Sequence, residues 1–237
     1  MGTYLNPGKA AFEEAVNSEI FIDKTEMLGY LNSVVKTRQK YVCVSRPRRF
    51  GKTMAADMIC AYYDREADSR SLFEGRKLAQ LSGWDENLGK FDVIYLVMTR
   101  FFKAGLSVSD ALSNIQKLVI RDFKRKYPGI DFLDNNDLIQ TLYDVYSAVG
   151  KQAVVIIDEW DAVFRALPND KPGQTEYLDY LRDLLKDNRY ISLAYMTGIL
   201  PIKKYGQHSA LNMFTEYSMM SPRQLAPYTG FTENEVQ

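Results

Sequence analysis

The sequence is poor in the residues that build disulfide frameworks and metal clusters. Among 237 residues it has two cysteines, Cys43 and Cys60, and a single histidine, His208. Cys43 lies in an apolar run and Cys60 in an expected helix, and neither has a second cysteine or histidine at the spacing of metal ligands. We therefore expect reduced thiols in a cytoplasmic protein. His208 is expected to be structural or exposed, which gives histidine-based catalysis little support.

The sequence also lacks an excess charge of either sign and any long apolar run. Thirty basic residues balance thirty acidic residues, so the formal net charge is zero. No stretch approaches the ~18 consecutive apolar residues that cross a bilayer, and the first residues show no charged-then-apolar signal pattern. Balanced charge disfavours a protein that coats nucleic acid. We expect neither a membrane nor a nucleic-acid partner for this segment.

Strand and helix signals alternate along the chain. The expected strands cover residues 41–44, 91–97, 154–157 and 191–196, and the expected helices include 10–16, 25–36, 53–63 and 175–186. Two more helices are expected from apolar faces, formed by Leu112, Ile115, Val119 and Phe123, and by Leu138, Leu142, Val145 and Val149. Strands that alternate with helices imply right-handed βαβ units. The predicted fold class is α/β, a three-layer α/β/α sandwich around a mainly parallel sheet.

The segment 45–53 connects an expected strand to an expected helix. It reads Ser-Arg-Pro-Arg-Arg-Phe-Gly-Lys-Thr, which fits the phosphate-loop pattern G-x-x-x-x-G-K-[ST] except that Arg46 replaces the first glycine. Gly51 lets the backbone approach a phosphate closely. Lys52 supplies a positive charge for the β- and γ-phosphates, and Thr53 offers a hydroxyl to Mg²⁺. The pattern predicts a site for a nucleoside triphosphate.

The rest of this loop carries more charge than the pattern requires. Backbone N–H groups at the start of the following helix favour an anion, and the predicted nucleotide-binding segment runs from Pro47 through Phe50 to Met54. Pro47 disfavours the helical region for the residue before it. Arg48 and Arg49 have two interpretations, either a clamp on phosphate oxygens or ion pairs with surface carboxylates. Which of the two reaches inward is open at this point.

Polar residues follow two later strands of the expected sheet. Asp158 and Glu159 end an apolar strand, at the edge where ligands of open α/β sheets bind. We expect Asp158 to hold Mg²⁺ together with Thr53, and Glu159 to polarise the attacking water. Thr197 ends the next strand and is expected to touch the γ-phosphate or the water. The predicted catalytic residues are therefore Glu159, Lys52 and Thr197.

These motifs resemble the AAA-ATPase-like family of bacterial P-loop proteins. The resemblance covers nearly the whole chain, and its most specific part is the run Arg-Pro-Arg-Arg-Phe-Gly-Lys-[Ser/Thr]. It implies an N-terminal ATPase domain with ATP and Mg²⁺ as cofactors, in which Lys52 and Thr53 are the phosphate-loop residues. The matching segments are residues 4–8, 21–25, 45–53, 157–161, 197–201, 211–214 and 230–233.

The resemblance also implies a sheet of the additional-strand type. In that arrangement a further strand lies between the loop strand and the acidic strand, and residues 91–97 are expected to be this strand. Asp158 corresponds to the acid that holds magnesium, Glu159 to the catalytic acid, and Thr197 to the sensor position. The sequence departs from the family pattern at Val97, where an acid is expected.

The domain organisation follows from the same resemblance. Residues 1–229 are expected to form the P-loop domain, with residues 1–40 as a helical extension that packs on it. Thr232 and Glu235 form a capping box, so residues 230–237 are expected to begin a truncated helical lid. Relatives usually continue into a restriction-endonuclease-like nuclease domain, which we expect to be absent here. Self-association, a C-terminal domain or a partner protein is the expected protein contact.

Three functional hypotheses stay open on the sequence. The first is a Mg²⁺-dependent ATPase whose turnover drives a conformational change. The second is a nucleotide-binding switch or interaction module with negligible turnover, which would need an arginine from a neighbouring subunit. The third is a nucleic-acid-binding domain that grips backbone phosphates with its arginine-rich loop, against which the zero net charge argues.

Overall fold

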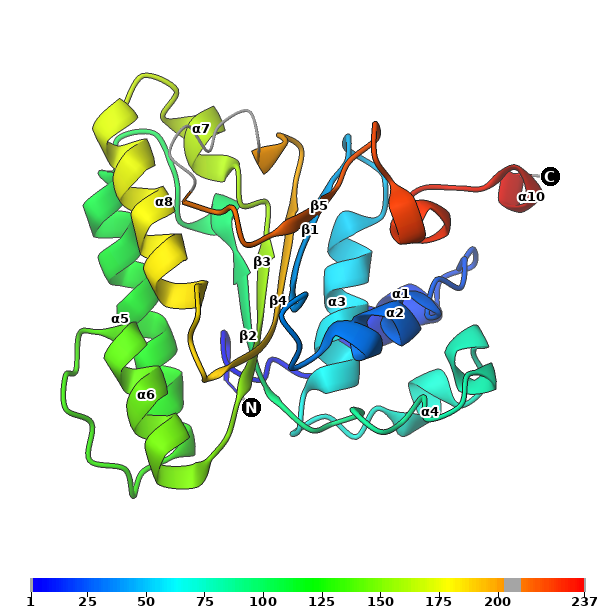
Figure 1. The fold of residues 1–237 in the computed structure, drawn as a ribbon, viewed down its shortest axis with the longest axis horizontal. Helices are drawn as coiled ribbons and strands as arrows, with labels where there is room; N and C mark the ends of the chain where they lie inside the picture. Colours follow the sequence, from blue (N-terminus) through cyan, green and yellow to red (C-terminus); the bar gives the residue numbers. More distant parts are fainter. Residues whose placement is uncertain (1, 203–209, 237) are drawn as a thin grey trace.

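The computed structural model of the chain describes residues 2–202 and 210–236. Its centre is a five-stranded sheet in the order β2-β3-β4-β1-β5, in which all neighbouring strands run parallel. The expected α/β fold with a parallel sheet between two helical layers is confirmed (Figure 1). The strands are β1 (Tyr41–Ser45), β2 (Asp92–Val97), β3 (Ala153–Asp158), β4 (Ile191–Gly198) and β5 (Thr215–Tyr217).

Helices cover both faces of the sheet (Figure 1). One layer contains α5 (Val108–Lys126), α6 (Leu138–Val149) and α8 (Lys171–Leu185), with the short α7 (Ala162–Ala166) at its end. The other layer contains α1 (Ala10–Val16), α2 (Met27–Val34), α3 (Lys52–Tyr63) and α4 (Arg70–Phe73). Short 3-10 turns are η1 (Lys77–Gln80), η2 (Met98–Arg100) and η3 (Arg223–Tyr228), and the described chain ends with α10 (Glu233–Val236).

The strand β3 shows how the sequence produces two cores. Its side chains alternate between the sheet faces, as the period of two in a strand requires. Val155 and Ile157 join the core under α5, α6 and α8, whereas Val154 and Ile156 join the core under α1, α2 and α3. All of β3 is buried because helices cover both faces. The site residues at its end are therefore held by a rigid element.

The expected position of the strand at residues 91–97 was wrong. This strand is β2, and it lies at the end of the sheet beyond β3. The strand between β1 and β3 is β4 instead, since the two edges of β1 pair with β4 and β5 and leave none for β2. In this arrangement Val97 is the register partner of Asp158. The sensor-position strand is thus the immediate neighbour of both the loop strand and the acidic strand.

Several smaller expectations from the sequence can also be compared with the structure. Val149 was expected on the apolar face of its helix but is 41% exposed, because it is the last residue of α6 and lies beyond the buried face. Cys43 and Cys60 are buried free thiols. Every helix in the described ranges is too short or too polar to cross a bilayer. The expectation for His208 lies outside the described residues.

Two short elements, α7 and β5, were not predicted from the sequence. Strand β5 has three residues and α7 has five, which is too short for a period to be recognised. The expected capping contact is present, since the side chain of Glu235 accepts a hydrogen bond from the N–H of Thr232 at 2.8 Å. Glu235 also pairs with Lys24 at 2.6 Å, which joins α10 to the N-terminal part of the chain.

Candidate functional site

The phosphate-loop segment lies between the end of β1 and the start of α3. Gly51 caps α3 in the left-handed region, with φ 71° and ψ 15°. A Cβ at Gly51 would meet only Met54 at 3.8 Å, so backbone conformation, rather than space, requires glycine here. No side chain in the described part of the chain caps α3. Its first-turn N–H groups are therefore available to an anion.

Lys52 closes back over its own loop. Its Nζ donates a hydrogen bond to the carbonyl oxygen of Pro47 at 2.8 Å. Burial lowers the pKa of Lys52, and the nearby carboxylates of Asp158 and Glu159 oppose this effect. The ammonium group therefore lies against its own loop, within the electrostatic influence of the acidic strand end. Its predicted phosphate contact stays a prediction.

The expected metal and sensor residues meet at three element ends. Asp158 is 1% exposed, and its Oδ2 accepts a hydrogen bond from Thr53 Oγ1 at 2.8 Å. Its Oδ1 accepts one from Thr197 Oγ1. These residues come from β3, α3 and β4, which the sheet order makes neighbours. A hydroxyl and a carboxylate are oxygen donors of the kind that Mg²⁺ uses with waters and substrate phosphates, so Thr53 and Asp158 fit the ion.

Glu159 follows in an unusual backbone conformation. Its φ of 56° lies in the left-handed region, which non-glycine residues adopt at a cost of about 1–3 kcal/mol. Its N–H donates to Thr197 Oγ1 at 3.3 Å, and its side chain Oε2 accepts a hydrogen bond from Arg165 Nη2 at 3.1 Å. Glu159 thus contacts Arg165, whereas Asp158 contacts Thr53 and Thr197.

Arg165 and Asp161 are site residues that the sequence reasoning missed. Arg165 Nε lies 3.4 Å from Asp161 Oδ2, and the same oxygen accepts hydrogen bonds from the N–H groups of Ile199 and Leu200. The charge of Arg165 also opposes protonation of Lys52, which places it in the electrostatic surroundings of the phosphate loop. The available signal was the (i, i+4) spacing of Asp161 and Arg165, which is typical of a helical ion pair.

The three loop arginines have different environments. Arg46 is 2% exposed and donates to Thr229 Oγ1 at 3.0 Å and to the carbonyl oxygen of Tyr217 at 3.1 Å. Arg48 and Arg49 are exposed. Across residues 2–202 and 210–236, neither forms an ion pair with a carboxylate within 4 Å. Within these ranges, the structure therefore contains no surface ion pair of the kind that one interpretation of Arg48 and Arg49 requires.

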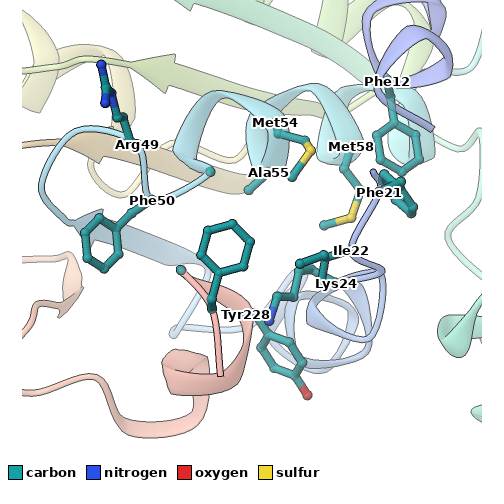
Figure 2. A pocket seen from close by; sticks show the side chains of 13 residues that line it. Phe12, Phe21, Ile22, Lys24, Arg49, Phe50, Met54, Ala55, Met58 and Tyr228 are labelled. Atoms are coloured by element: carbon teal, nitrogen blue, oxygen red, sulfur yellow. The ribbon is translucent and has the colours of Figure 1, made fainter. Parts of the chain in front are cut away.

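An apolar cavity begins at the loop and extends along α3. Its walls are side chains from three separate parts of the chain (Figure 2). The N-terminal part supplies Phe12 and Phe21, α3 supplies Met54 and Met58, and the C-terminal part supplies Tyr228 and Phe231. Arg49, Phe50 and Gly51 of the phosphate loop line the same cavity. The sequence reasoning missed this cavity because its aromatic residues come from distant parts of the chain, Phe12, Phe21 and Phe50 on one side and Tyr228 and Phe231 on the other.

The comparison with known families supplies the assignment. Residues 8–207 match the family model described as Predicted AAA-ATPase. The chain belongs to this AAA-ATPase-like family. Together with the order of its parallel sheet, family membership identifies this AAA-ATPase-like chain as an ATP-binding P-loop domain. The resemblance that the sequence motifs indicated is thereby confirmed at the level of the family.

Individual relatives are distant from this AAA-ATPase-like chain. An uncharacterized protein from the vnfD 5′ region of Azotobacter chroococcum mcd 1 is 23% identical over 223 residues, which are 91% of this chain and 40% of that protein. Drosophila ORC bound to GC-rich DNA and Cdc6 is 11% identical, with a TM-score of 0.40 over 88% of this chain and 59% of that one. Drosophila ORC bound to AT-rich DNA and Cdc6 is 12% identical, with a TM-score of 0.38 over 88% of this chain and 58% of that one. The chain thus spans less than two thirds of these relatives.

Proposed function

We propose that this domain is a Mg²⁺-dependent ATPase whose nucleotide turnover drives a conformational change. One observation carries the proposal: Asp158 accepts hydrogen bonds from both Thr53 and Thr197, next to a phosphate loop that opens into an apolar cavity. In this proposal the triphosphate binds along the loop and the base contacts the apolar side chains of the cavity, because nucleotide and cofactor sites are mostly apolar with a few polar groups at one end.

Each residue has a defined part in this proposal. Lys52 exchanges the carbonyl oxygen of Pro47 for oxygens of the β- and γ-phosphates. Thr53 and Asp158 hold Mg²⁺, which when bound neutralises charge that develops on the phosphates. Thr197, hydrogen-bonded to Asp158, is placed to respond to the γ-phosphate. The neighbours of Lys52 in the loop, from Pro47 to Met54, surround the phosphates with their backbone.

Glu159 is the proposed general base. It is half-buried at the end of a buried strand, which fits a residue that must reach water while being held in place. It must part from Arg165 to orient the attacking water. A carboxylate in this role contributes about 10²–10⁴-fold to the rate.

The proposed conformational change involves the cavity walls. Because these walls come from both the N-terminal and the C-terminal parts of the chain, a base that enters the cavity changes the contacts between them. The recipients that we propose for this movement are a second copy of the chain or a further domain or partner protein. A cytoplasmic location also belongs to the proposal.

A second candidate is a nucleotide-binding switch with negligible turnover. The ion pair between Glu159 and Arg165 favours it, because a glutamate held by a guanidinium is not free to polarise water. In that case, ATP binds at the same loop and in the same cavity. Hydrolysis then requires a partner that draws Arg165 away, or that supplies an arginine of its own.

Release of inorganic phosphate from Mg·ATP tests the proposal. The wild-type chain is expected to hydrolyse ATP, and Glu159→Gln is expected to lose about 10²–10⁴-fold of the rate while ATP still binds. Glu74→Gln, which changes an exposed glutamate at the end of α4, is the matched control and should keep the wild-type rate. Equal rates in wild type and Glu159→Gln would remove Glu159 from the mechanism. ATP binding without phosphate release at any protein concentration would establish the switch.

A further inference from the structure

Arg46 is the residue that stands where the phosphate-loop pattern has glycine. Its backbone continues the line of the sheet, since its N–H donates to the carbonyl oxygen of Gly198 at 3.0 Å. Its side chain is buried and directed to the C-terminal part of the chain. Nε donates to Thr229 Oγ1 at 3.0 Å, and Nη1 donates to the carbonyl oxygens of Tyr217 at 3.1 Å and Ser45 at 3.3 Å.

One acceptor of Arg46, Thr229, belongs to the segment that lines the C-terminal side of the apolar cavity. Thr229 lies between Tyr228 and Gly230, both of which line the cavity. The same segment has a second attachment to the loop, because the N–H of Gly230 donates to the carbonyl oxygen of Phe50 at 3.3 Å. The cavity wall at residues 228–231 is therefore attached to the phosphate loop at both the entry and the exit of the loop.

Among residues 2–202 and 210–236, the charge of Arg46 has no carboxylate partner. All three of its acceptors are neutral oxygens, and burial lowers the pKa of its guanidinium. A buried cation of this kind is costly, so its benefit must come from the geometry of its hydrogen bonds. The planar guanidinium offers several N–H donors in a fixed arrangement. That arrangement can reach a hydroxyl and two carbonyl groups together, and a glycine has none of these donors.

We propose that Arg46 is a positioning residue for the base end of the nucleotide. The proposal rests on the proposed function, in which the cavity receives the base of ATP. Arg46 fixes the wall that carries Tyr228 and Phe231, so the base enters a cavity that is already formed. When the wall is already ordered in the free protein, binding loses less conformational entropy. Ligands that contact the wall therefore bind with higher affinity. In the proposed binding mode the phosphates contact Lys52 and the backbone of the loop, whereas Tyr228 and Phe231 contact only the base.

If Arg46 has this role, replacing it with the glycine of the phosphate-loop pattern should weaken nucleotide binding. Arg46→Gly completes G-x-x-x-x-G-K-[ST], and we expect it to weaken Mg·ATP binding by at least about tenfold, because it removes charged hydrogen bonds that hold the wall. Inorganic tripolyphosphate, which has no base, should bind with unchanged affinity. Thr229→Val removes the acceptor of Nε, together with the hydrogen bond that Thr229 Oγ1 donates to the carbonyl oxygen of Leu225 at 3.3 Å, and keeps the shape of the side chain. This variant should also bind Mg·ATP more weakly and tripolyphosphate equally well, with a smaller loss of ATP affinity than Arg46→Gly.

Isothermal titration of both ligands into the wild-type chain and the two variants is the test. Arg38→Gly, at an exposed arginine outside the site, is the control and should bind both ligands like wild type. Tripolyphosphate affinity reports whether the loop itself is intact, and Thr229→Val carries the test if Arg46→Gly does not fold. An equal loss of affinity for both ligands, or tighter ATP binding in Arg46→Gly, would overturn the proposal. A wild-type chain that binds neither ligand would instead overturn the proposed function.

Discussion

Asp57 is a partly buried carboxyl close to the candidate site. It lies on α3 one turn after Thr53, and it accepts a hydrogen bond from Tyr95 Oη at 2.9 Å. Burial raises the pKa of Asp57 to about 6, with a further contribution from the charge of Asp158, whereas the Tyr95 hydrogen bond opposes the rise. The native chain therefore keeps a proton that the unfolded chain releases between pH 3.8 and about 6. Stability falls as the pH rises through that window.

Asp57→Asn is expected to stabilise the domain at neutral pH. Asparagine keeps an acceptor for the tyrosine hydroxyl and removes the buried charge, so the free energy of unfolding should rise by about 2 kcal/mol at pH 7.5. The gain should become small at pH 4.5, where the native carboxyl is protonated. Urea unfolding at the two pH values measures it, with Asp131→Asn, at an exposed carboxyl, as the control. A loss of stability of equal size at both pH values would contradict this account.

Single residues of the site were predictable where their role is local. Lys52, Thr53 and Asp158 were recognised from short motifs, and the structure brings them together with Thr197 and Glu159. Whether they act as proposed stays a prediction. Arg46 and Arg165 were not predictable in the same way. The partners of Arg46 are about 170 to 180 positions away, and no local pattern reports such a contact.

At the scale of single elements, the end of α6 depends on backbone conformation alone. Gly150 ends this helix in the left-handed region, with φ 62°, and its N–H donates to the carbonyl oxygen of Tyr146 at 2.9 Å. A Cβ at Gly150 would meet nothing within 4 Å. The cost of a side chain there is therefore conformational and free of steric clash.

Gly150→Ala is expected to lower the free energy of unfolding by about 1 kcal/mol. Gly129→Ala is the matched control, because a Cβ at Gly129 also meets nothing within 4 Å and its φ is not positive. That variant should be neutral or slightly stabilising, since alanine restricts the unfolded chain. Chemical denaturation of both variants gives the comparison. Equal effects of the two substitutions would show that the left-handed conformation is not what glycine provides.

Most helices and strands could be predicted from the sequence, but the order of the strands in the sheet could not. The apolar strands and amphipathic helices were found near their observed bounds because period and composition are local signals. The position of β2 was mistaken because the choice of strand partners depends on long-range pairing. Strand β5 was missed since three residues carry no period. The additional strand beside β1 could be expected from the family, but the choice of β4 for that place required the structure.

At the scale of the whole molecule, the N-terminal residues protect an edge of the sheet. Leu5 forms an antiparallel bridge with Ile94 of β2. Asn6 is buried, and its side chain donates to Asp92 Oδ1 at 2.9 Å and accepts from the N–H of Val93 at 2.7 Å. An uncovered edge strand is a template for pairing between chains. The segment thus completes the domain at the side of the sheet away from β5.

Asn6→Ala is expected to destabilise the domain by about 2–3 kcal/mol, because it leaves the buried N–H of Val93 without a partner. The exposed edge should also make the variant more prone to aggregation on heating. Urea unfolding and light scattering measure the two effects. Asn114→Ala, at an exposed position of α5, should change neither. A variant with wild-type stability would mean that the N-terminal residues do not hold the edge.

Every role proposed for the site depends on the binding of Mg·ATP at the phosphate loop. A thermal-shift titration tests it most directly, because a ligand that binds only the native state raises stability by about 2.7 kcal/mol at one hundred times its Kd. For a domain of this size, the rise in Tm is about 5–10 °C. We predict this rise for the wild-type chain and for the control Lys151→Ala, at an exposed lysine, and its loss in Lys52→Ala. No rise in the wild type, or an equal rise in Lys52→Ala, would contradict the account.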